Sequence, residues 1–415
     1  GGLMEVIIDR CAGLDVGKDE VVGCVRTPSP SGRGRSSELR TFLTFTSGLE
    51  QLADWLTANG VAEVVMEATG PYWKPIWYLL EGRGFDLKLV NAKHVKMVPG
   101  RKTDLADAAW LAQLLEHGLL AGSFVPPAPI RELRDLTRYR KRLIQTHTAE
   151  QQRVQKVLED AGIKLDSVAS DVLGVSGRLM LRALINGEHD AEVLADLAKA
   201  GLRKKIPQLR EALRGSFRDH HATMLAITLD HIDSLESAIA RLDQEIDRVM
   251  TPFGEARDRL DTIVGVGKRA AECIIAEIGV DMDRFPTAAH LASWADVCPG
   301  NNITGGKRRS GATNNGNRWL GEILHQCADA ASHTRNTYLA AQFWRLQRRI
   351  GRGKAAVAVG HSIVVICWHL LSNNCDYDDL GGDWFVRRTD ADKRRDHLIR
   401  QLHDLGYRVA LTKVA

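Results

Sequence analysis

The chain has 415 residues, too many for one ordinary hydrophobic core, so two or three domains are expected. Apolar residues make up 44% and charged residues 26%, which excludes an intrinsically disordered protein. The formal net charge is only +4, so any binding of nucleic acid must come from local basic patches. The seven cysteines form no C-x-x-C pair, which argues against a disulfide scaffold or a zinc knuckle and predicts reduced thiols in a cytoplasmic protein.

Residues 1–125 alternate strand and helix patterns, as expected of an α/β domain. Strand-like composition occurs in four segments, which are 5–28 (with two β-rich runs), 38–46, 62–70 and 85–92. Helical periodicity occurs in three others, which are 48–60, 72–84 and a stretch that runs to about His117. Because the strands come first in hairpins and then alternate with helices, we expect a mixed sheet.

A proline-rich segment, FVPPAPI (124–130), predicts a domain boundary, and residues 126–256 then form a helical region. Two long helices are expected, at about 130 to 161 and 221 to 250, with less regular sequence between them. The second helix has apolar residues in heptad-like spacing, typical of a coiled coil: Leu225, Leu229, Ile232, Leu235, Ile239, Leu242, Ile246 and Val249. The two helices therefore pair with each other, with a second copy of the chain, or both.

Residues 257–375 predict a mostly α-helical C-terminal domain. The segment DTIVGVGKRAAECIIAEIG (261–279) has a helix-hairpin-helix-like pattern, which either presents backbone N–H groups to a phosphate or is a plain helical hairpin. A basic connector is expected at 345–354. The apolar run 355–371 is short for a membrane span and predicts a buried helix, so no membrane partner is expected. The tail, 376–415, receives no assignment.

Basic residues concentrate in the first long helix and in a Gly- and Asn-rich loop at 298–319. Such side chains bind nucleic-acid backbone, which gives affinity and salt sensitivity without sequence choice. The candidate nucleic-acid-binding residues are Arg138, Arg140, Lys141, Arg142, Arg153, Lys156, Lys307, Arg308, Arg309 and Arg318.

Four carboxylates in the first domain predict a metal site. Asp15 lies within an apolar strand and Glu67 at the end of another, while Asp104 and Asp107 share one face at the start of a helix. Three of these acids have a structural alternative: Asp15 as a turn residue, Asp104 as a helix cap and Asp107 as a first-turn residue favoured by the helix dipole. Together they offer the oxygen ligands that Mg²⁺ or Mn²⁺ prefers, and such ions can activate a phosphodiester.

These motifs resemble the DEDD-type insertion-sequence transposases, the bridge-RNA-guided recombinases related to pilin-gene invertases. The resemblance spans roughly residues 5 to 372 and rests on GLDVGKD (13–19), MEATGPYW (66–73), NAKHVKMVPGRKTDLADAAWLAQLL (91–115) and CPGNN…GGKRRSG…GNRWL (298–320). It implies a RuvC-like N-terminal domain with the RNase H fold, whose metal-binding tetrad falls on Asp15, Glu67, Asp104 and Asp107. It also implies a C-terminal transposase domain with a serine nucleophile, and a composite site shared between chains.

The C-terminal loop departs from the family pattern. Related sequences usually show Asn-Asn-Glu-Ser-Ala-Gly-Lys, whereas this chain has NNITGGK (301–307), which places Thr304 in the serine position. A threonine hydroxyl can act as a nucleophile, although its branched Cβ restricts χ1. Three readings stay open: Thr304 is the nucleophile, Ser310 replaces it, or the protein only binds.

The resemblance implies a DNA transposase or recombinase that cleaves and exchanges strands through a covalent hydroxyl–phosphoryl intermediate. Its implied partners are donor and target DNA, a structured guide (bridge) RNA, and further copies of itself as dimers and tetramers. A bacterial, cytoplasmic protein that acts at the nucleoid is expected. Two alternatives remain: a RuvC-like junction nuclease that hydrolyses DNA with water, and a non-catalytic, transposase-derived nucleic-acid-binding protein.

Overall fold

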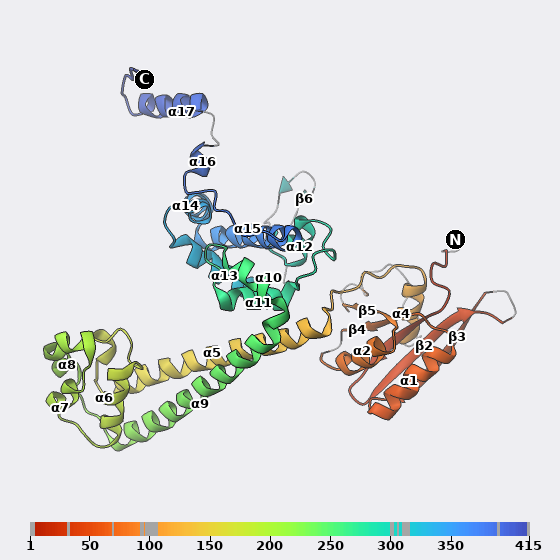
Figure 1. Cartoon of the computed structure of the whole chain (residues 1–415), viewed down its shortest axis with the longest axis horizontal. Coiled ribbons are helices and arrows are strands. Elements are labelled where there is room, and N and C mark those ends of the chain that lie inside the picture. The colour runs from red at the N-terminus through yellow and green to blue at the C-terminus, as the bar shows by residue number, and fades with distance from the viewer. Residues whose placement is uncertain are drawn as a thin grey trace. The chain divides into compact units, whose positions relative to one another are not determined.

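The structure, a computed structural model, describes residues 5–30, 34–68, 70–91, 95, 107–298, 303–304, 307–308, 316–387 and 391–412. The chain divides into two compact units, Gly1–Val125 and Pro126–Ala415. The first is built on a sheet and the second is almost entirely helical among its described residues (Figure 1). We describe each unit by itself.

The first unit contains a five-stranded mixed sheet in the order β3-β2-β1-β4-β5, as predicted for an α/β domain. β1, β2 and β3 are antiparallel neighbours, whereas β4 and β5 continue the sheet in parallel with β1. The strands are β1 (Cys11–Val16), β2 (Glu20–Pro28), β3 (Arg35–Leu43), β4 (Glu63–Glu67) and β5 (Asp86–Val90). The helices are α1 (Thr46–Ala58), α2 (Trp73–Gly82) and α4 (Asp107–Glu116).

Strand alternation divides the apolar side chains of β1 between two cores. Leu14 and its neighbours on one face pack with residues of α1 and α2, including Leu52 and Ile76. Cys11 on the other face packs with Val65 and with Leu111 of α4. Since successive side chains of a strand point to opposite faces, Gly13 and Asp15 lie on the same face as Cys11, toward α4.

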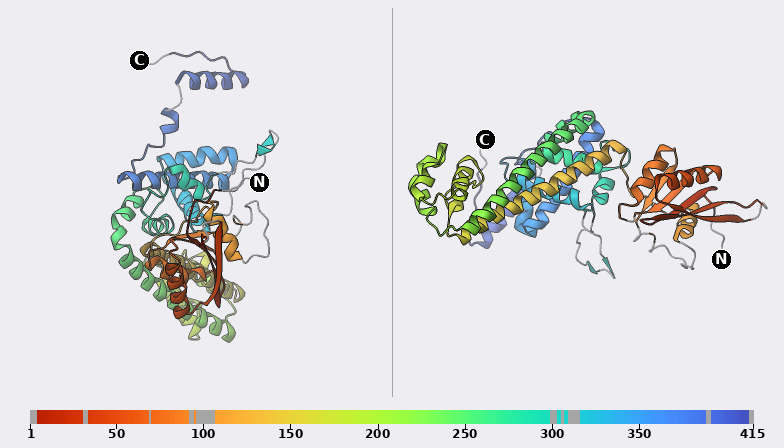
Figure 2. Two further views of the ribbon diagram at one scale, coloured as in Figure 1. Left: turned by 90° about the vertical axis from the view of Figure 1, so that its right-hand side faces the viewer. Right: turned by 90° about the horizontal axis from the view of Figure 1, so that it is seen from below.

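Two long helices, α5 (Ala128–Asp160) and α9 (Asp219–Met250), pack side by side in the second unit (Figure 2). The heptad-spaced side chains of α9 at Leu225, Leu229 and Ile232 are fully buried, whereas Leu242 is only half-buried. Of the pairings that the sequence left open, the structure shows the one in which α5 and α9 pack against each other within one chain. The pair forms an arm.

Residues 161–218 form a small helical bundle at the end of the arm, where the sequence suggested only irregular structure. Its elements are η1 (Leu165–Ser167), α6 (Val175–Ile185), α7 (Ala191–Asp196), η2 (Ala200–Lys205) and α8 (Ile206–Ala212). Buried Met180, Leu194 and Leu209 pack with Val157 of α5 and Leu229 of α9. These helices are short, which explains why no long periodic pattern marks them.

The remaining helices form the C-terminal domain: η3 (Thr251–Phe253), α10 (Gly254–Asp261), α11 (Lys268–Ile278), α12 (Ala288–Trp294), α13 (Arg318–Ser332), α14 (Tyr338–Ile350) and α15 (Arg352–Asn373). Its other elements are the hairpin strands β6 (Ile303–Thr304) and β7 (Lys307–Arg308), and the tail helices α16 (Trp384–Arg387) and α17 (Ala391–Asp404). The prediction of a basic connector at 345–354 is wrong, because these residues are helical except at Gly351. α14 continues through Ile350, and only Gly351, with φ 83°, separates it from α15.

Helix α15 is the only helix of the described residues that is long and apolar enough to cross a membrane. It packs against α10, α12, α13 and α14, and residues along it, such as Val359, Ile363 and Cys367, are fully buried. It is therefore the core helix of this domain, as the sequence predicted.

The start of the tail docks on α14. Tyr338 stacks on Phe385 with ring centroids 5.1 Å apart, and the Arg345 guanidinium lies 4.1 Å from the Phe385 ring centroid. Asp379 accepts hydrogen bonds from the Tyr338 backbone N–H and the Tyr377 hydroxyl. Residues 376–387, which the sequence left unassigned, thus belong to the C-terminal domain.

Candidate active site

Asp15 and Glu67 lie at the carboxyl ends of two neighbouring parallel strands. Leu14 of β1 is opposite Met66 of β4, so the next residue of each strand brings Asp15 beside Glu67. Both side chains are half-buried, and both have polar partners in the structure. The alternation of β1 and β4 directs the two carboxylates to the face that α4 covers.

Helix α4 brings a third carboxylate to the same end of the sheet. The helix crosses β1 at Gly13, where an added Cβ would lie 2.9 Å from Leu111 Cβ and still closer to the Ala108 carbonyl oxygen. The Cys11 thiol, farther from Asp15 along β1, donates a hydrogen bond to the Ala112 carbonyl at 3.5 Å. α4 therefore runs antiparallel to β1, and its first residue, Asp107, lies toward Asp15.

Three of the four predicted metal ligands are thus gathered by the fold. Asp104 lies outside the described residues. The donor set consists of carboxylate oxygens, the ligand type that Mg²⁺ and Mn²⁺ take in proteins. Asp107 is exposed and Asp15 and Glu67 are only half-buried, so solvent and a substrate phosphate can approach. The residues present fit a divalent cation.

The part of the C-terminal domain between Asp296 and Gly316 carries Thr304 and Ser310, and we call it the hydroxyl-bearing segment. It contains a short antiparallel hairpin, formed by β6 and β7, where the sequence suggested a plain loop. Ile303 pairs with Arg308, and Thr304 pairs with Lys307. The side chains of Thr304, Lys307 and Arg308 are outside the described part of the structure. Arg309 and Ser310 lie outside the described residues altogether. The choice between Thr304 and Ser310 as nucleophile therefore stays a prediction.

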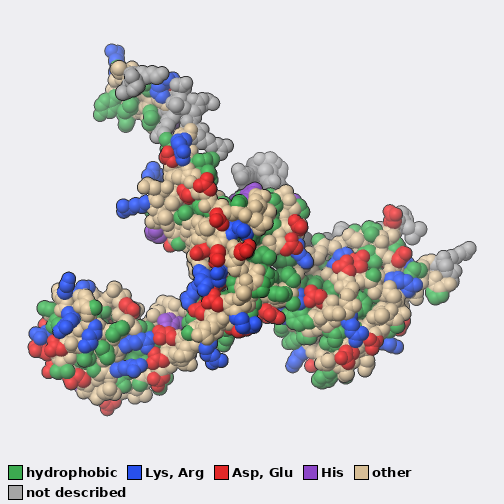
Figure 3. Space-filling view, viewed as in Figure 1, with side chains coloured by type: hydrophobic (Ala, Val, Ile, Leu, Met, Phe, Trp, Pro, Cys, Tyr) green, Lys and Arg blue, Asp and Glu red, His purple; other side chains and the backbone are tan. Residues whose placement is uncertain are grey.

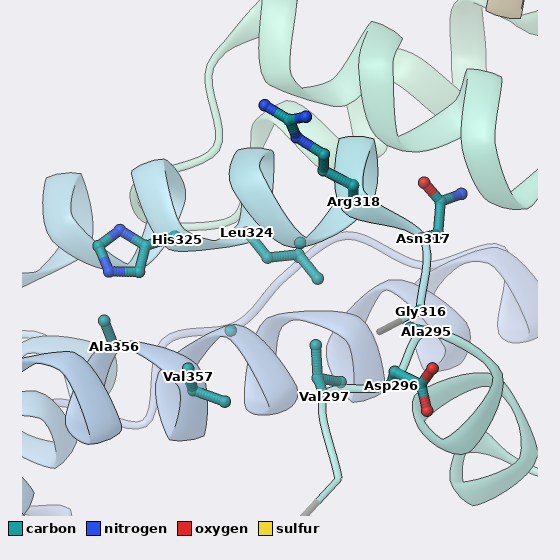
Figure 4. Close-up of a pocket in the computed structure, with 12 residues that line it drawn as sticks. Ala295, Asp296, Val297, Gly316, Asn317, Arg318, Leu324, His325, Ala356 and Val357 are labelled. Atoms are coloured by element: carbon teal, nitrogen blue, oxygen red, sulfur yellow. The ribbon is translucent and has the colours of Figure 1, made fainter. Parts of the chain in front are cut away.

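The two ends of this segment meet at Asp296 and Gly316. Asp296 has a φ of 55°, and an added Cβ on Gly316 would lie 2.7 Å from Asp296 Cγ, so only glycine allows this approach. A cavity of about 390 Å³ lies beside the contact, between α13 and α15. Figure 4 shows Asp296, Gly316 and Asn317 at its edge, with His325 farther along α13. Both ends of the segment are therefore fixed to the helical core.

Several predicted nucleic-acid-binding residues of α5 make ion pairs inside the protein. Arg138 donates two hydrogen bonds to Glu277, at 2.7 and 2.8 Å, and Lys141 lies 2.6 Å from Glu322. Arg140 is only 3% exposed and donates to Glu272 and Asp243, each at 2.8 Å. These carboxylates compensate the three cations within the chain.

Sequence reasoning missed the acidic partners of the arginines in α5. Glu272 and Glu277 are both buried, although Lys, Arg, Asp and Glu are almost never fully buried unless paired. A usable signal was present, because both acids interrupt the apolar run AAECIIAEIG (270–279). Burial lowers the pKa of the neighbouring Arg134 guanidinium to about 10, an effect that Glu277 opposes. Arg134 therefore remains charged at neutral pH.

Four other residues predicted to bind nucleic acid lie on the surface. Arg142, Arg153, Lys156 and Arg318 are exposed, although Arg153 contacts Glu150 and Arg318 contacts Glu322. Arg142 also lies over the Trp319 ring, 5.6 Å from its centroid. On the face shown in Figure 3, basic and acidic side chains are interspersed along the arm instead of forming one basic stripe.

A second cluster of possible metal ligands, Asp160, His220 and His221, occurs where α5 ends and α9 begins. His221 Nδ1 accepts a hydrogen bond from the Arg218 backbone N–H at 3.1 Å, so Nδ1 is unprotonated and Nε2 donates to Asp160 at 2.9 Å. Metal binding through Nε2 would require an imidazolate or loss of this cap. The geometry therefore indicates a helix cap, in which the hydrogen bond from His221 lowers the pKa of Asp160.

Comparison with known families places both halves of the chain. A model for DEDD-type IS110 transposases matches residues 12–163. This range includes all four predicted metal ligands, Asp15, Glu67, Asp104 and Asp107. A model described as "Transposase IS116/IS110/IS902 family" matches residues 257–345, which include the hydroxyl-bearing segment. No match was found among curated proteins. The two family matches, in this order and on these residues, show that the chain belongs to the DEDD-type IS110 family of transposases and acts on DNA.

Proposed function

We propose that this transposase cleaves and exchanges DNA strands through a covalent enzyme–DNA intermediate that requires a divalent cation and a guide RNA. The observation that carries the proposal is the convergence of Asp15, Glu67 and Asp107 at one end of the sheet. A protein that only bound DNA would gain nothing from clustered negative charge beside a phosphate backbone. The strand order 3-2-1-4-5 supports the RuvC-like assignment of this domain.

The carboxylates of Asp15, Glu67 and Asp107, with Asp104 from the preceding residues, would hold Mg²⁺ or Mn²⁺. When bound, such an ion polarises the scissile phosphate and neutralises developing charge. The protein's own contribution is to fix the carboxylates on rigid elements, two strands and one helix, so that little reorganisation is needed during the reaction.

The chemistry we propose at Thr304 consists of two transfers at one phosphorus atom. The Thr304 hydroxyl loses its proton and its oxygen attacks the scissile phosphorus, the bond from phosphorus to the 3′ oxygen breaks, and that oxygen takes up a proton. The 3′ hydroxyl of the partner strand then loses its proton and attacks the phosphorus of the phosphothreonine. The bond from phosphorus to the Thr304 oxygen breaks, that oxygen takes up a proton, and the new strands are joined. Lys307, Arg308 and Arg309 would stabilise the charge that develops. The ester conserves the bond energy, so no ATP is needed.

Guide-RNA targeting and self-association extend the proposal. The exposed Arg142, Arg153 and Lys156 offer backbone contacts without base selection, which suits a protein whose target is chosen by RNA pairing. Half-buried Leu242 leaves apolar surface on the arm for a second copy. We propose a metal-binding domain at 1–125, an arm at 126–256 and a transposase domain at 257–375, followed by a tail at 376–415 whose first residues, 376–387, pack on the transposase domain. We also propose that the protein is cytoplasmic and acts at the bacterial nucleoid.

A trapping experiment tests the proposed function. The protein is incubated with Mg²⁺, the element's own RNA and nicked donor DNA, and the products are resolved under denaturing conditions. We expect a protein–DNA adduct that Thr304→Ser retains and Thr304→Ala lacks. Loss of the adduct in Ser310→Ala but not in Thr304→Ala would move the nucleophile to Ser310.

A junction nuclease that uses water is the second candidate function. It is favoured by one observation, the replacement of the family's Glu-Ser by Ile303-Thr304. The same experiment separates the two: free 5′-phosphate product without an adduct supports the nuclease. Absence of any metal-dependent cleavage would support the third reading, a protein that only binds nucleic acid.

A further inference from the structure

A single buried carboxylate joins three helices beside the hydroxyl-bearing segment. Glu277 lies near the end of α11, and its side chain is 3% exposed. It accepts hydrogen bonds from Arg138 of α5 and, at 2.6 Å, from Asn317 Nδ2. Arg134 of α5 adds an ion pair at 3.4 Å and donates to the Glu277 backbone carbonyl at 2.7 Å. The charge of Glu277 is thus shared between the arm and the residue before α13.

Asn317 uses both ends of its amide group. Its oxygen accepts hydrogen bonds from the Trp319 and Leu320 backbone N–H groups, at 3.1 and 3.2 Å, and so caps α13. Its nitrogen donates to Glu277. Gly316, the preceding residue, is pressed against Asp296 at the other end of the segment (Figure 4). Asn317 therefore fixes the point where the chain leaves the segment that carries Thr304.

We propose that Glu277 and Asn317 are positioning residues that tie this segment to the base of the arm. In this proposal neither residue is the nucleophile or a metal ligand. Their hydrogen bond sets where the segment returns to the helical core, and Arg138 fixes Glu277 to α5. The inference rests on the proposed covalent function, because its consequence is the rate at which the segment's hydroxyl attacks DNA. A misplacement of about 1 Å can lower such a rate roughly 100-fold.

The test exchanges donor and acceptor across this hydrogen bond. Asn317→Asp keeps the cap on α13 but places a second carboxylate against Glu277. Glu277→Gln in the same chain restores the bond to position 317, since the introduced side-chain amide can donate to the new carboxylate; its oxygen keeps one of the two hydrogen bonds from Arg138, and the one from Arg138 Nη2 is lost. Asn317→Ser is an additional variant that retains a capping oxygen but removes the side-chain amide that donates to Glu277.

Glu272→Gln is the matched control. Glu272 lies on the same helix, is equally buried and pairs with Arg140 of the same arm, but it does not contact Asn317. We measure the rate of adduct formation at saturating DNA, the DNA concentration for half-maximal rate, and thermal unfolding. Asn317→Asp and Asn317→Ser should lower the maximal rate about 10- to 100-fold with little change in DNA affinity. The double variant should be faster than Asn317→Asp, because it restores the hydrogen bond between positions 277 and 317.

Four outcomes decide the matter. Wild-type protein that forms no adduct refutes the proposed function itself. An active wild type with Asn317→Ser at the wild-type rate overturns the positioning role alone. A loss of rate in Glu272→Gln as large as in Asn317→Asp would show that general weakening of the arm is responsible, and would overturn it too. Recovery in the double variant, with Glu272→Gln near wild type, supports it.

Discussion

Gly13 controls the distance between the third carboxylate and the other two. The substitution Gly13→Ala adds a Cβ atom that would lie 2.9 Å from Leu111 Cβ and closer still to backbone atoms of Ala108 and Ala112. Backbone cannot move aside as a side-chain end does, so α4 as a whole must retreat from β1. Asp107 at its first turn moves with it, while Asp15 stays on the strand.

The size of the shift follows from the contact distance. Ordinary contact begins at 3.4 Å, whereas the added Cβ would lie 2.3 Å from the Ala108 carbonyl oxygen, so α4 must move by roughly 1 Å. Overpacking of this kind costs about 1–3 kcal/mol in the free energy of unfolding. A displacement near 1 Å within a catalytic group can lower the rate about 100-fold. We therefore expect Gly13→Ala to fold with modest loss of stability and to lose most metal-dependent cleavage.

The assay compares Mg²⁺-dependent cleavage of nicked DNA with urea unfolding for Gly13→Ala and a control, Gly82→Ala. Gly82 lies in helix α2 with no heavy atom within 4 Å of an added Cβ, so the control should be neutral or stabilised by up to about 1 kcal/mol. Gly13→Ala that cleaves as fast as wild type would refute the argument that this helix contact positions Asp107.

Other predictions concern the site, the arm and the thiols. Asp15→Asn should remove metal-dependent cleavage while RNA binding, measured by filter retention, stays unchanged. Arg140→Ala should cost about 3–5 kcal/mol in urea unfolding, because it leaves a buried carboxylate without its cation. Arg142→Ala should instead leave the free energy of unfolding within about 0.5 kcal/mol of wild type. It should reduce the slope of log binding constant against log salt concentration by roughly one, because one phosphate contact is lost. Burial raises the pKa of Cys11 to about 12, so at pH 8 its thiol stays protonated in the folded protein and exposed Cys375 should alkylate far faster; equal rates by mass spectrometry would contradict the buried position.

The positions of strands and helices could be predicted from the sequence more reliably than the residues that pack or pair with them. Asp15 and Glu67 could be assigned to strands because apolar residues flank them, and both long helices could be bounded within a few residues. That Glu67 would lie beside Asp15 depended on β4 pairing with β1, which no local pattern states.

The arm shows most clearly why pairing is hard to read from sequence. A run of arginines in a helix predicts a nucleic-acid surface, yet the carboxylate that compensates Arg140 is 132 residues away in the chain. The bundle at 161–218 escaped detection because each of its helices is too short to show a sustained period. In both cases the decisive contacts are long-range.

The arm also constrains the order in which the chain can fold as it is synthesised. α5 is complete 58 residues before its partner α9 begins, and a lone helix in water is marginally stable. The bundle core takes Val154 and Leu158 from the end of α5 and Leu225 from the start of α9. Pairing of α5 and α9 can therefore start from this core and extend along the two helices toward the ion pair between Asp243 and Arg140. α11 is synthesised after both helices of the arm, so its ion pairs with α5 can form only once the sequence of the whole arm has been made.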